Sequence, residues 1–176
     1  MSGYIGVSST TGPGIGKRSG TLIGYFGNPQ VDPSTTGASR YTFTVPSDPT
    51  TVVQLTRTTD NNNHCAVSPY YSNPTLGPQN TVYLRLENTR STTAAGATSK
   101  YVYDTNAIGY AETTIFTVDP DTGDIGIDWF NPDYTALLYI VLYQSYLYVT
   151  GDVSAFEGQI GSTNVQVVDL VFMTAT

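Results

Sequence analysis

Apolar and polar residues alternate with a period of two along several short segments of the chain. In residues 40–45 the odd positions are Tyr, Phe and Val and the even ones Arg and Thr, and residues 82–87 alternate in the same way. Successive side chains of a strand point to opposite faces, so this pattern predicts strands with one buried and one solvated face. Similar β-type runs lie at residues 4–8, 20–26, 40–45, 52–57, 81–87, 100–103, 113–118, 125–130, 137–143, 146–150 and 165–173.

The segments between these runs are typical of turns. Nine of the ten prolines follow Gly, Asn, Asp or Ser, pairs that favour turns over strand interiors. No segment keeps a helical period over three turns, and the best helical candidate is a single turn at residues 153–158 with Asp152 as its N-cap. The sequence therefore predicts an all-β fold, an antiparallel, jelly-roll-like β-sandwich of about 9–11 strands. We expect residues 1–176 to form one domain.

One long aliphatic segment changes parity within itself. Residues 138, 140 and 142 are aliphatic, but the next such residues are Leu147 and Val149. A single flat strand would send these two sets to opposite faces. A turn or bulge near Gln144 and Ser145 would bring both to one core, so we predict a central hairpin here. The last run changes parity in a similar way, which predicts a bulge near Val168.

Charge is sparse and unevenly distributed along the chain. Charged residues make up 12% of it, and the net charge is −7. All seven Lys and Arg lie in residues 1–100, whereas residues 101–176 carry ten acidic residues and no basic one. Nucleic acids and anionic membranes both require a basic footprint, so we expect neither as a partner. The acidic excess serves solubility, or it forms a patch for a cation or a polyhydroxylated ligand.

Cysteine content and the first residues bear on the cellular compartment. Cys65 is the single cysteine, so no intrachain disulfide can form. The opening residues MSGYIGV have neither a basic region nor an apolar one of the kind that secretory signals carry. We expect a cytoplasmic protein, or one exported without a classical signal peptide, that does not insert into membranes.

Residues 58–78 form the longest stretch without a strand signal. Loops of this length in compact domains are often functional, and this one is rich in polar side chains. His64 and Cys65 are adjacent in it, so on an extended chain they point to opposite faces and do not make a catalytic dyad. One His and one Cys also leave too few ligands for a zinc site.

Three carboxylates lie close together in the segment Asp119, Asp121 and Asp124. The segment joins two β-type runs and contains Gly123, which adopts positive φ without strain, so it predicts a hairpin turn. Calcium could also use three such oxygens, and the sequence leaves that alternative open. We expect no metal and no cofactor.

The only tryptophan stands beside polar turn residues. Aromatic rings stack on the C–H face of a sugar, while amide and carboxylate groups bond its hydroxyls. The long loop offers the same two kinds of side chain. The predicted ligand-binding residues are Trp129, Asn131, Asp133, Tyr134, Asn62, Tyr70, Tyr71 and Asn73. The alternative is that Trp129 belongs to the core and that residues 131–133 form an ordinary turn.

Residues 117–156 contain a series of short motifs. They are Thr122-Gly123, Trp129, Asn131-Pro132-Asp133, Tyr139-Ile140-Val141 and Leu147-Tyr148-Val149-Thr150-Gly151-Asp152-Val153. In these motifs the chain resembles uncharacterised small β-proteins of mushroom-forming fungi, although Tyr134 stands where glycine is expected. The resemblance implies a fungal origin and a compact β fold, and the leaderless β-proteins of fruiting bodies include many lectins.

These observations predict a carbohydrate-binding, lectin-like protein that holds a glycan through loop aromatics and Asn or Asp side chains, without catalysis. A homo-oligomer is left open. One alternative is a structural or self-assembling β-protein whose tyrosine-rich faces pack together. The other is a polysaccharide hydrolase that uses paired carboxylates, although Glu87, Glu112 and Glu157 lie in unrelated segments.

Overall fold

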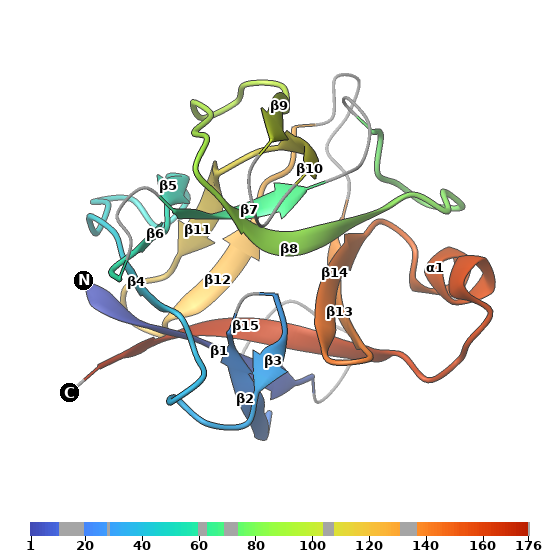
Figure 1. Cartoon of the computed structure of the whole chain (residues 1–176), viewed down its shortest axis with the longest axis horizontal. Coiled ribbons are helices and arrows are strands. Elements are labelled where there is room, and N and C mark those ends of the chain that lie inside the picture. Colours follow the sequence, from blue (N-terminus) through green and yellow to red (C-terminus); the bar gives the residue numbers. More distant parts are fainter. Residues whose placement is uncertain are drawn as a thin grey trace.

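The computed structural model describes residues 1–10, 20–27, 29–59, 63–68, 74–103, 108–130 and 137–175 (Figure 1). Its one helix in this part of the chain, α1 (Val153–Ile160), joins two strands, and the fold is otherwise nearly all β, as predicted. The strands are β1 (Ser2–Ser9), β2 (Leu22–Phe26), β3 (Val31–Asp32), β4 (Arg40–Thr42), β5 (Val53–Gln54), β6 (Thr56–Arg57), β7 (His64–Ser68), β8 (Tyr83–Thr89), β9 (Lys100–Tyr103), β10 (Ile108–Ala111), β11 (Thr114–Val118), β12 (Asp124–Ile127), β13 (Tyr139–Tyr143), β14 (Tyr146–Thr150) and β15 (Gln166–Thr174).

Eight of these strands form a closed antiparallel barrel. Their order is β1-β4-β6-β7-β8-β14-β13-β15, and β15 pairs back onto β1 from Gly3 opposite Thr174 to Ser9 opposite Val168. β2 and β3 extend the sheet from β1, and β12, β11 and β5 extend it from β15. The prediction of a jelly-roll-like sandwich is therefore corrected to a barrel with additional strands. The pairing of the first and last strands joins what would otherwise be separate layers.

Alternate side chains of the barrel strands fill its interior. β8 directs Leu84 and Leu86 inward, and β14 directs Leu147 and Val149 inward. All four belong to one buried apolar cluster. The predicted alternation of residues 82–87 is thus confirmed, and the other face of β8 and β14 points away from the core.

The β13–β14 hairpin accounts for the first change of parity. Its strands pair from Tyr139 opposite Thr150 to Tyr143 opposite Tyr146, which leaves Gln144 and Ser145 as the turn and confirms the predicted hairpin. The predicted bulge near Val168 is wrong. β15 pairs with β1 and β13 without a shift in register and buries its even-numbered residues. The preceding valine at position 167 lies instead on the outer face, opposite Val141.

β7 is a strand that lies inside the segment expected to be a loop. All of its residues are buried, and it pairs with β8 over five residue pairs. Cys65 and Val67 join the barrel core, while Ala66 packs with Ala111 at the end of β10 on the opposite face. A strand covered on both faces shows no alternation of polar and apolar residues, so its sequence gave no strand signal. Burial also raises the pKa of the Cys65 thiol.

Two local predictions are confirmed at turns. The Asp152 carboxylate caps α1 by accepting a hydrogen bond from the Ala155 N–H at 2.9 Å, and the helix runs on to Ile160 before Gly161 ends it at φ 66°. The segment from Asp119 to Asp124 closes the β11–β12 hairpin, with Gly123 at φ 80°. Among the described residues, no three His, Cys, Asp or Glu side chains are grouped as metal ligands would be.

Within the described ranges, the helical content includes no segment with the length and apolar character needed to cross a membrane.

Candidate functional site

Of the eight predicted ligand-binding residues, Trp129 is the one that the structure describes. Its side chain is 4% exposed, and its Nε1 donates a hydrogen bond to the Pro74 carbonyl at 3.1 Å. A buried ring offers no face on which a sugar could stack, so this indole is part of the core. The other seven residues lie outside the described residues and stay predictions: Asn62, Tyr70, Tyr71, Asn73, Asn131, Asp133 and Tyr134.

The contact between Trp129 and Pro74 nevertheless connects the two segments that the sequence singled out. These residues are 55 positions apart, yet they meet inside the protein. Beside them, the Phe130 N–H donates to Glu112 Oε2 at 3.2 Å.

Glu112 is the chemically unusual group at this junction. It is 1% exposed, and its Oε1 has no hydrogen-bond partner in the described structure. Burial, opposed by the Phe130 N–H and assisted by the negative charge of Asp128, raises the pKa of Glu112 to about 8. The carboxyl group is therefore largely protonated and neutral at pH 7.

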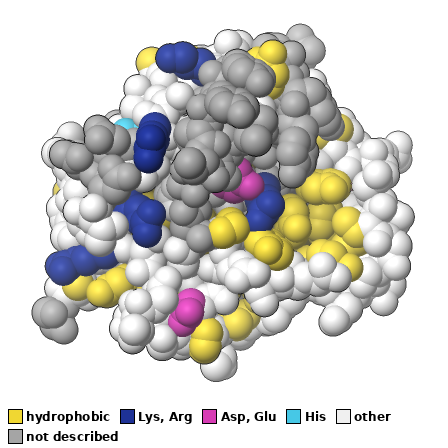
Figure 2. All heavy atoms as spheres, viewed as in Figure 1, with side chains coloured by type: hydrophobic (Ala, Val, Ile, Leu, Met, Phe, Trp, Pro, Cys, Tyr) yellow, Lys and Arg dark blue, Asp and Glu magenta, His cyan; other side chains and the backbone are white. Residues whose placement is uncertain are grey.

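A different set of aromatic residues reaches the surface of the barrel. The tyrosine face consists of four half-buried side chains on the outer face of β8, β13 and β14: Tyr83, Tyr143, Tyr146 and Tyr148. Figure 2 shows hydrophobic side chains gathered over the region that β13, β14 and α1 occupy in Figure 1. The strand register brings these tyrosines to one face, because Tyr143 lies opposite Tyr146 and Tyr148 lies opposite Arg85 of β8.

Phe156 of α1 holds part of the tyrosine face in place. Its ring is fully buried and meets Tyr83 edge-on at a centroid distance of 5.1 Å and Tyr148 at 5.4 Å. Tyr83 and Tyr148 also contact each other edge-to-face at 5.5 Å. Such aromatic contacts have defined geometry and contribute about 0.5–1.5 kcal/mol each beyond their buried area. The helix thus presets the orientation of these rings.

Polar groups border the same rings. The guanidinium of Arg85 lies over the Tyr146 ring, 4.2 Å from its centroid. Arg85 also forms an ion pair with Glu87, in which Nε and Oε1 are 3.2 Å apart. The amide of Gln30 donates to the Tyr146 hydroxyl at 3.0 Å. Donors, acceptors and ring surfaces therefore occur together on this face, as they do in binding sites for amphipathic ligands.

The turn beside the tyrosine face has a strained backbone. Gln144 and Ser145 adopt φ values of 49° and 68°, a region that disfavours residues with a Cβ. The turn is held by a 2.7 Å hydrogen bond from the Val31 N–H to the Ser145 carbonyl, and the Gln144 amide donates to the Tyr143 hydroxyl at 3.0 Å. Positive φ at both central residues is the geometry that a two-residue hairpin turn requires, and Gln and Ser adopt it less easily than Asn or Gly.

The parity of the tyrosines in the sequence is a signal for the tyrosine face. The tyrosines at positions 139, 143, 146 and 148 occupy the parity opposite to the aliphatic residues of the same two runs. Once the hairpin turn is placed, those positions fall on one face. The contribution of β8 and of Phe156 depends on long-range pairing and packing, and no local pattern shows it.

Comparison of the chain with models of protein families, with curated proteins and with solved structures finds no match.

Proposed function

We propose that this protein binds carbohydrate through the tyrosine face, without chemical change to the ligand. The observation that carries the proposal is the grouping of four half-buried tyrosines on one outward face beside a strained turn. A sugar ring has an apolar C–H face and a rim of hydroxyls, so it needs an aromatic surface with hydrogen-bonding groups around it. The tyrosine hydroxyls, Gln30, Gln144 and Arg85 supply such groups.

Other ligands that stack on aromatic rings fit less well. Single-stranded nucleic acids stack on tyrosines too, but they also require a basic groove that neutralises phosphates. This chain has a net charge of −7, and β13, β14 and α1 belong to the half that has no basic residue. A ligand that has no phosphates and combines apolar and hydroxylated surface is the better match.

The test is a glycan array followed by calorimetry on the glycans that bind. Tyr143→Ala and Tyr146→Ala each remove a ring next to the turn, and each should weaken binding about tenfold, a loss of about 1.4 kcal/mol. Tyr25→Ala is the matched control. Tyr25 is also a half-buried tyrosine in an edge-to-face pair, with Tyr4 at 6.1 Å, but it lies on β2 outside the tyrosine face.

The outcomes separate the competing interpretations. Binding that is lost in both tyrosine variants and kept in Tyr25→Ala supports the proposal. Binding that survives both substitutions would move the site elsewhere, for example to the predicted residues of segments 69–73 and 131–134. If no glycan binds, and the same variants instead disperse an oligomer in light scattering, then the face packs against a second copy of this chain and the proposal fails.

A further inference from the structure

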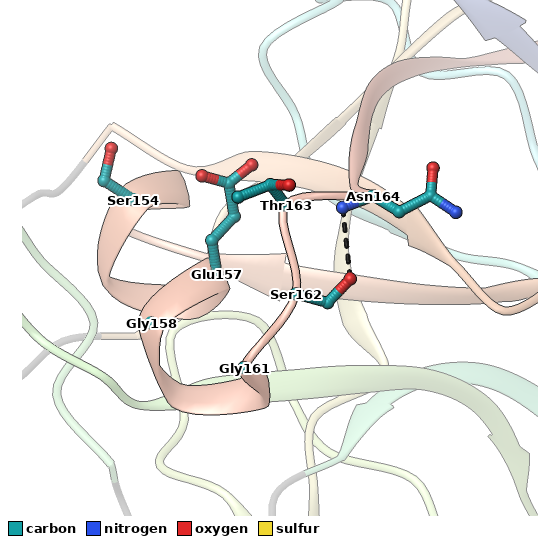
Figure 3. A pocket seen from close by; sticks show the side chains of 7 residues that line it. All are labelled: Ser154, Glu157, Gly158, Gly161, Ser162, Thr163 and Asn164. Carbon is teal, nitrogen blue, oxygen red and sulfur yellow. Dashed lines mark hydrogen bonds between the residues drawn. The ribbon is translucent and has the colours of Figure 1, made fainter.

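A second surface feature lies on α1 and the turn that follows it. A shallow hollow, wide open to solvent and with about 570 Å³ of accessible space, lies between the helix and the chain leading to β15. Seven residues line it: Ser154, Glu157, Gly158, Gly161, Ser162, Thr163 and Asn164. In Figure 3 the Glu157 side chain points from the helix toward Thr163, and Ser154 lies on the first turn of the helix. The lining offers hydroxyl, amide and carboxylate groups and no aromatic ring.

The electrostatics of the hollow favour a positive ligand. It adjoins the C-terminal end of α1, where the helix dipole places a partial negative charge of about half an elementary charge, offset in part because the Gly161 and Ser162 N–H groups donate to the Glu157 carbonyl. The last turn of the helix contains no basic residue to offset it, and Glu157 adds a full negative charge. The chain from residue 101 onward has no Lys or Arg at all. A protonated amine is the group that these features would hold.

Gly158 provides an independent reason to regard the hollow as a site. Glycine inside a helix is unfavourable relative to alanine, so its presence there needs an explanation. Packing does not supply one, because a Cβ built on Gly158 would meet no atom within 4 Å. Gly158 does line the hollow, where a methyl group would take space from a bound molecule.

We infer that the hollow is a subsite for the ammonium group of an amino sugar, next to the tyrosine face. The inference rests on the proposed function and names the class of glycan. Phe156, under the tyrosine face, and Glu157, in the hollow, are consecutive residues of α1, and a helix is about 10 Å across. A short oligosaccharide stacked on the tyrosines can therefore extend over the helix and place a free amine against the Glu157 carboxylate.

The experiment compares two tetrasaccharides of β-linked glucosamine, one fully N-acetylated and one fully deacetylated. Calorimetry at mildly acidic pH keeps the free amines of the deacetylated ligand protonated. The deacetylated ligand should bind about fivefold more tightly, and raising the salt concentration should reduce that advantage. Glu157→Gln should remove the advantage and leave the acetylated ligand unaffected.

Two helix variants complete the design. Gly158→Ala should raise the melting temperature and still weaken binding of the deacetylated ligand, a combination that a merely structural role would not produce. Gln159→Ala is the control, since Gln159 is exposed on the same helix and does not line the hollow. It should leave both affinities unchanged.

Equal affinities for the two tetrasaccharides, or an unchanged preference in Glu157→Gln, would overturn the inference. In that event, binding that Tyr146→Ala abolishes still supports the proposed function. Binding of neither tetrasaccharide also overturns the inference, and the glycan array then decides the proposed function separately.

Discussion

Replacing Glu112 with glutamine should remove a large dependence of stability on pH. Glutamine has nearly the same shape and can still accept the hydrogen bond from the Phe130 N–H through its amide oxygen. It cannot ionise. In the unfolded chain the Glu112 carboxyl titrates with the ordinary pKa of 4.5, whereas in the folded protein burial raises that pKa to about 8.

The sign and size of the effect follow from these two values. Between pH 4.5 and 8 the folded protein binds a proton that the unfolded chain has released, so the free energy of unfolding falls as the pH rises. Each pH unit in this window lowers the free energy of unfolding by about 1.4 kcal/mol, which amounts to a loss of about 3 kcal/mol between pH 4.5 and pH 7. The contribution is fully present below pH 4.5 and is lost by pH 8.

Urea unfolding at several pH values, followed by the fluorescence of the buried Trp129, measures this directly. Wild type and Glu112→Gln should be similar in stability at about pH 4, below the unfolded pKa, and the variant should be more stable by about 3 kcal/mol at pH 7. His64, the only histidine, is present in both proteins and cancels in the difference. Glu157→Gln makes the same substitution at a half-buried position of α1 and serves as the control.

Parallel stability curves for wild type and Glu112→Gln across this range would refute the reasoning. They would mean that the buried carboxyl is not neutral in the folded protein, or that the contact between Trp129 and Pro74 opens to water as the carboxyl ionises.

Three further substitutions test the turns and the helix by urea unfolding or melting temperature. Ser145→Gly should stabilise the protein by about 1 kcal/mol, since glycine adopts the φ of 68° found at this position without strain. Gly123→Ala should destabilise the protein, because the added Cβ would lie 2.5 Å from the Phe172 carbonyl oxygen. Effects of the same sign in the two variants would contradict this. Phe156→Ala should lower the free energy of unfolding by about 3 kcal/mol and reduce the near-ultraviolet circular dichroism of the tyrosines that Phe156 contacts. An unchanged near-ultraviolet spectrum would contradict this packing. Hydrogen bonds from Ala155 N–H and then Gln79 N–H lower the pKa of Asp152, so its contribution is present above the ordinary Asp pKa and is lost as the pH falls through the lowered value. Asp152→Asn should therefore melt below wild type at neutral pH and converge with it in acid, and equal melting temperatures of the two proteins at neutral pH would exclude this role.

Local patterns in the sequence were sufficient for the elements whose two faces differ. The alternation of residues 82–87 predicted β8, the change of parity predicted the β13–β14 hairpin, and Asp152 marked the start of α1. In each case the cause acts within a few residues, through the period of a strand, the geometry of a turn or a side-chain cap. The same reasoning failed for β7, whose two faces are both covered.

Only the tertiary structure decided the closure of the barrel and the composition of the candidate site. The pairing of β1 with β15 joins the two ends of the chain, and no local period encodes a partner so distant. Trp129 illustrates the same limit, since a lone tryptophan before a polar turn is compatible with both an exposed ring and a buried one. Its hydrogen bond to Pro74, 55 residues away, places it in the core. The tyrosines reach one surface because three strands and a helix set their register together, which is a property of packing rather than of any single segment.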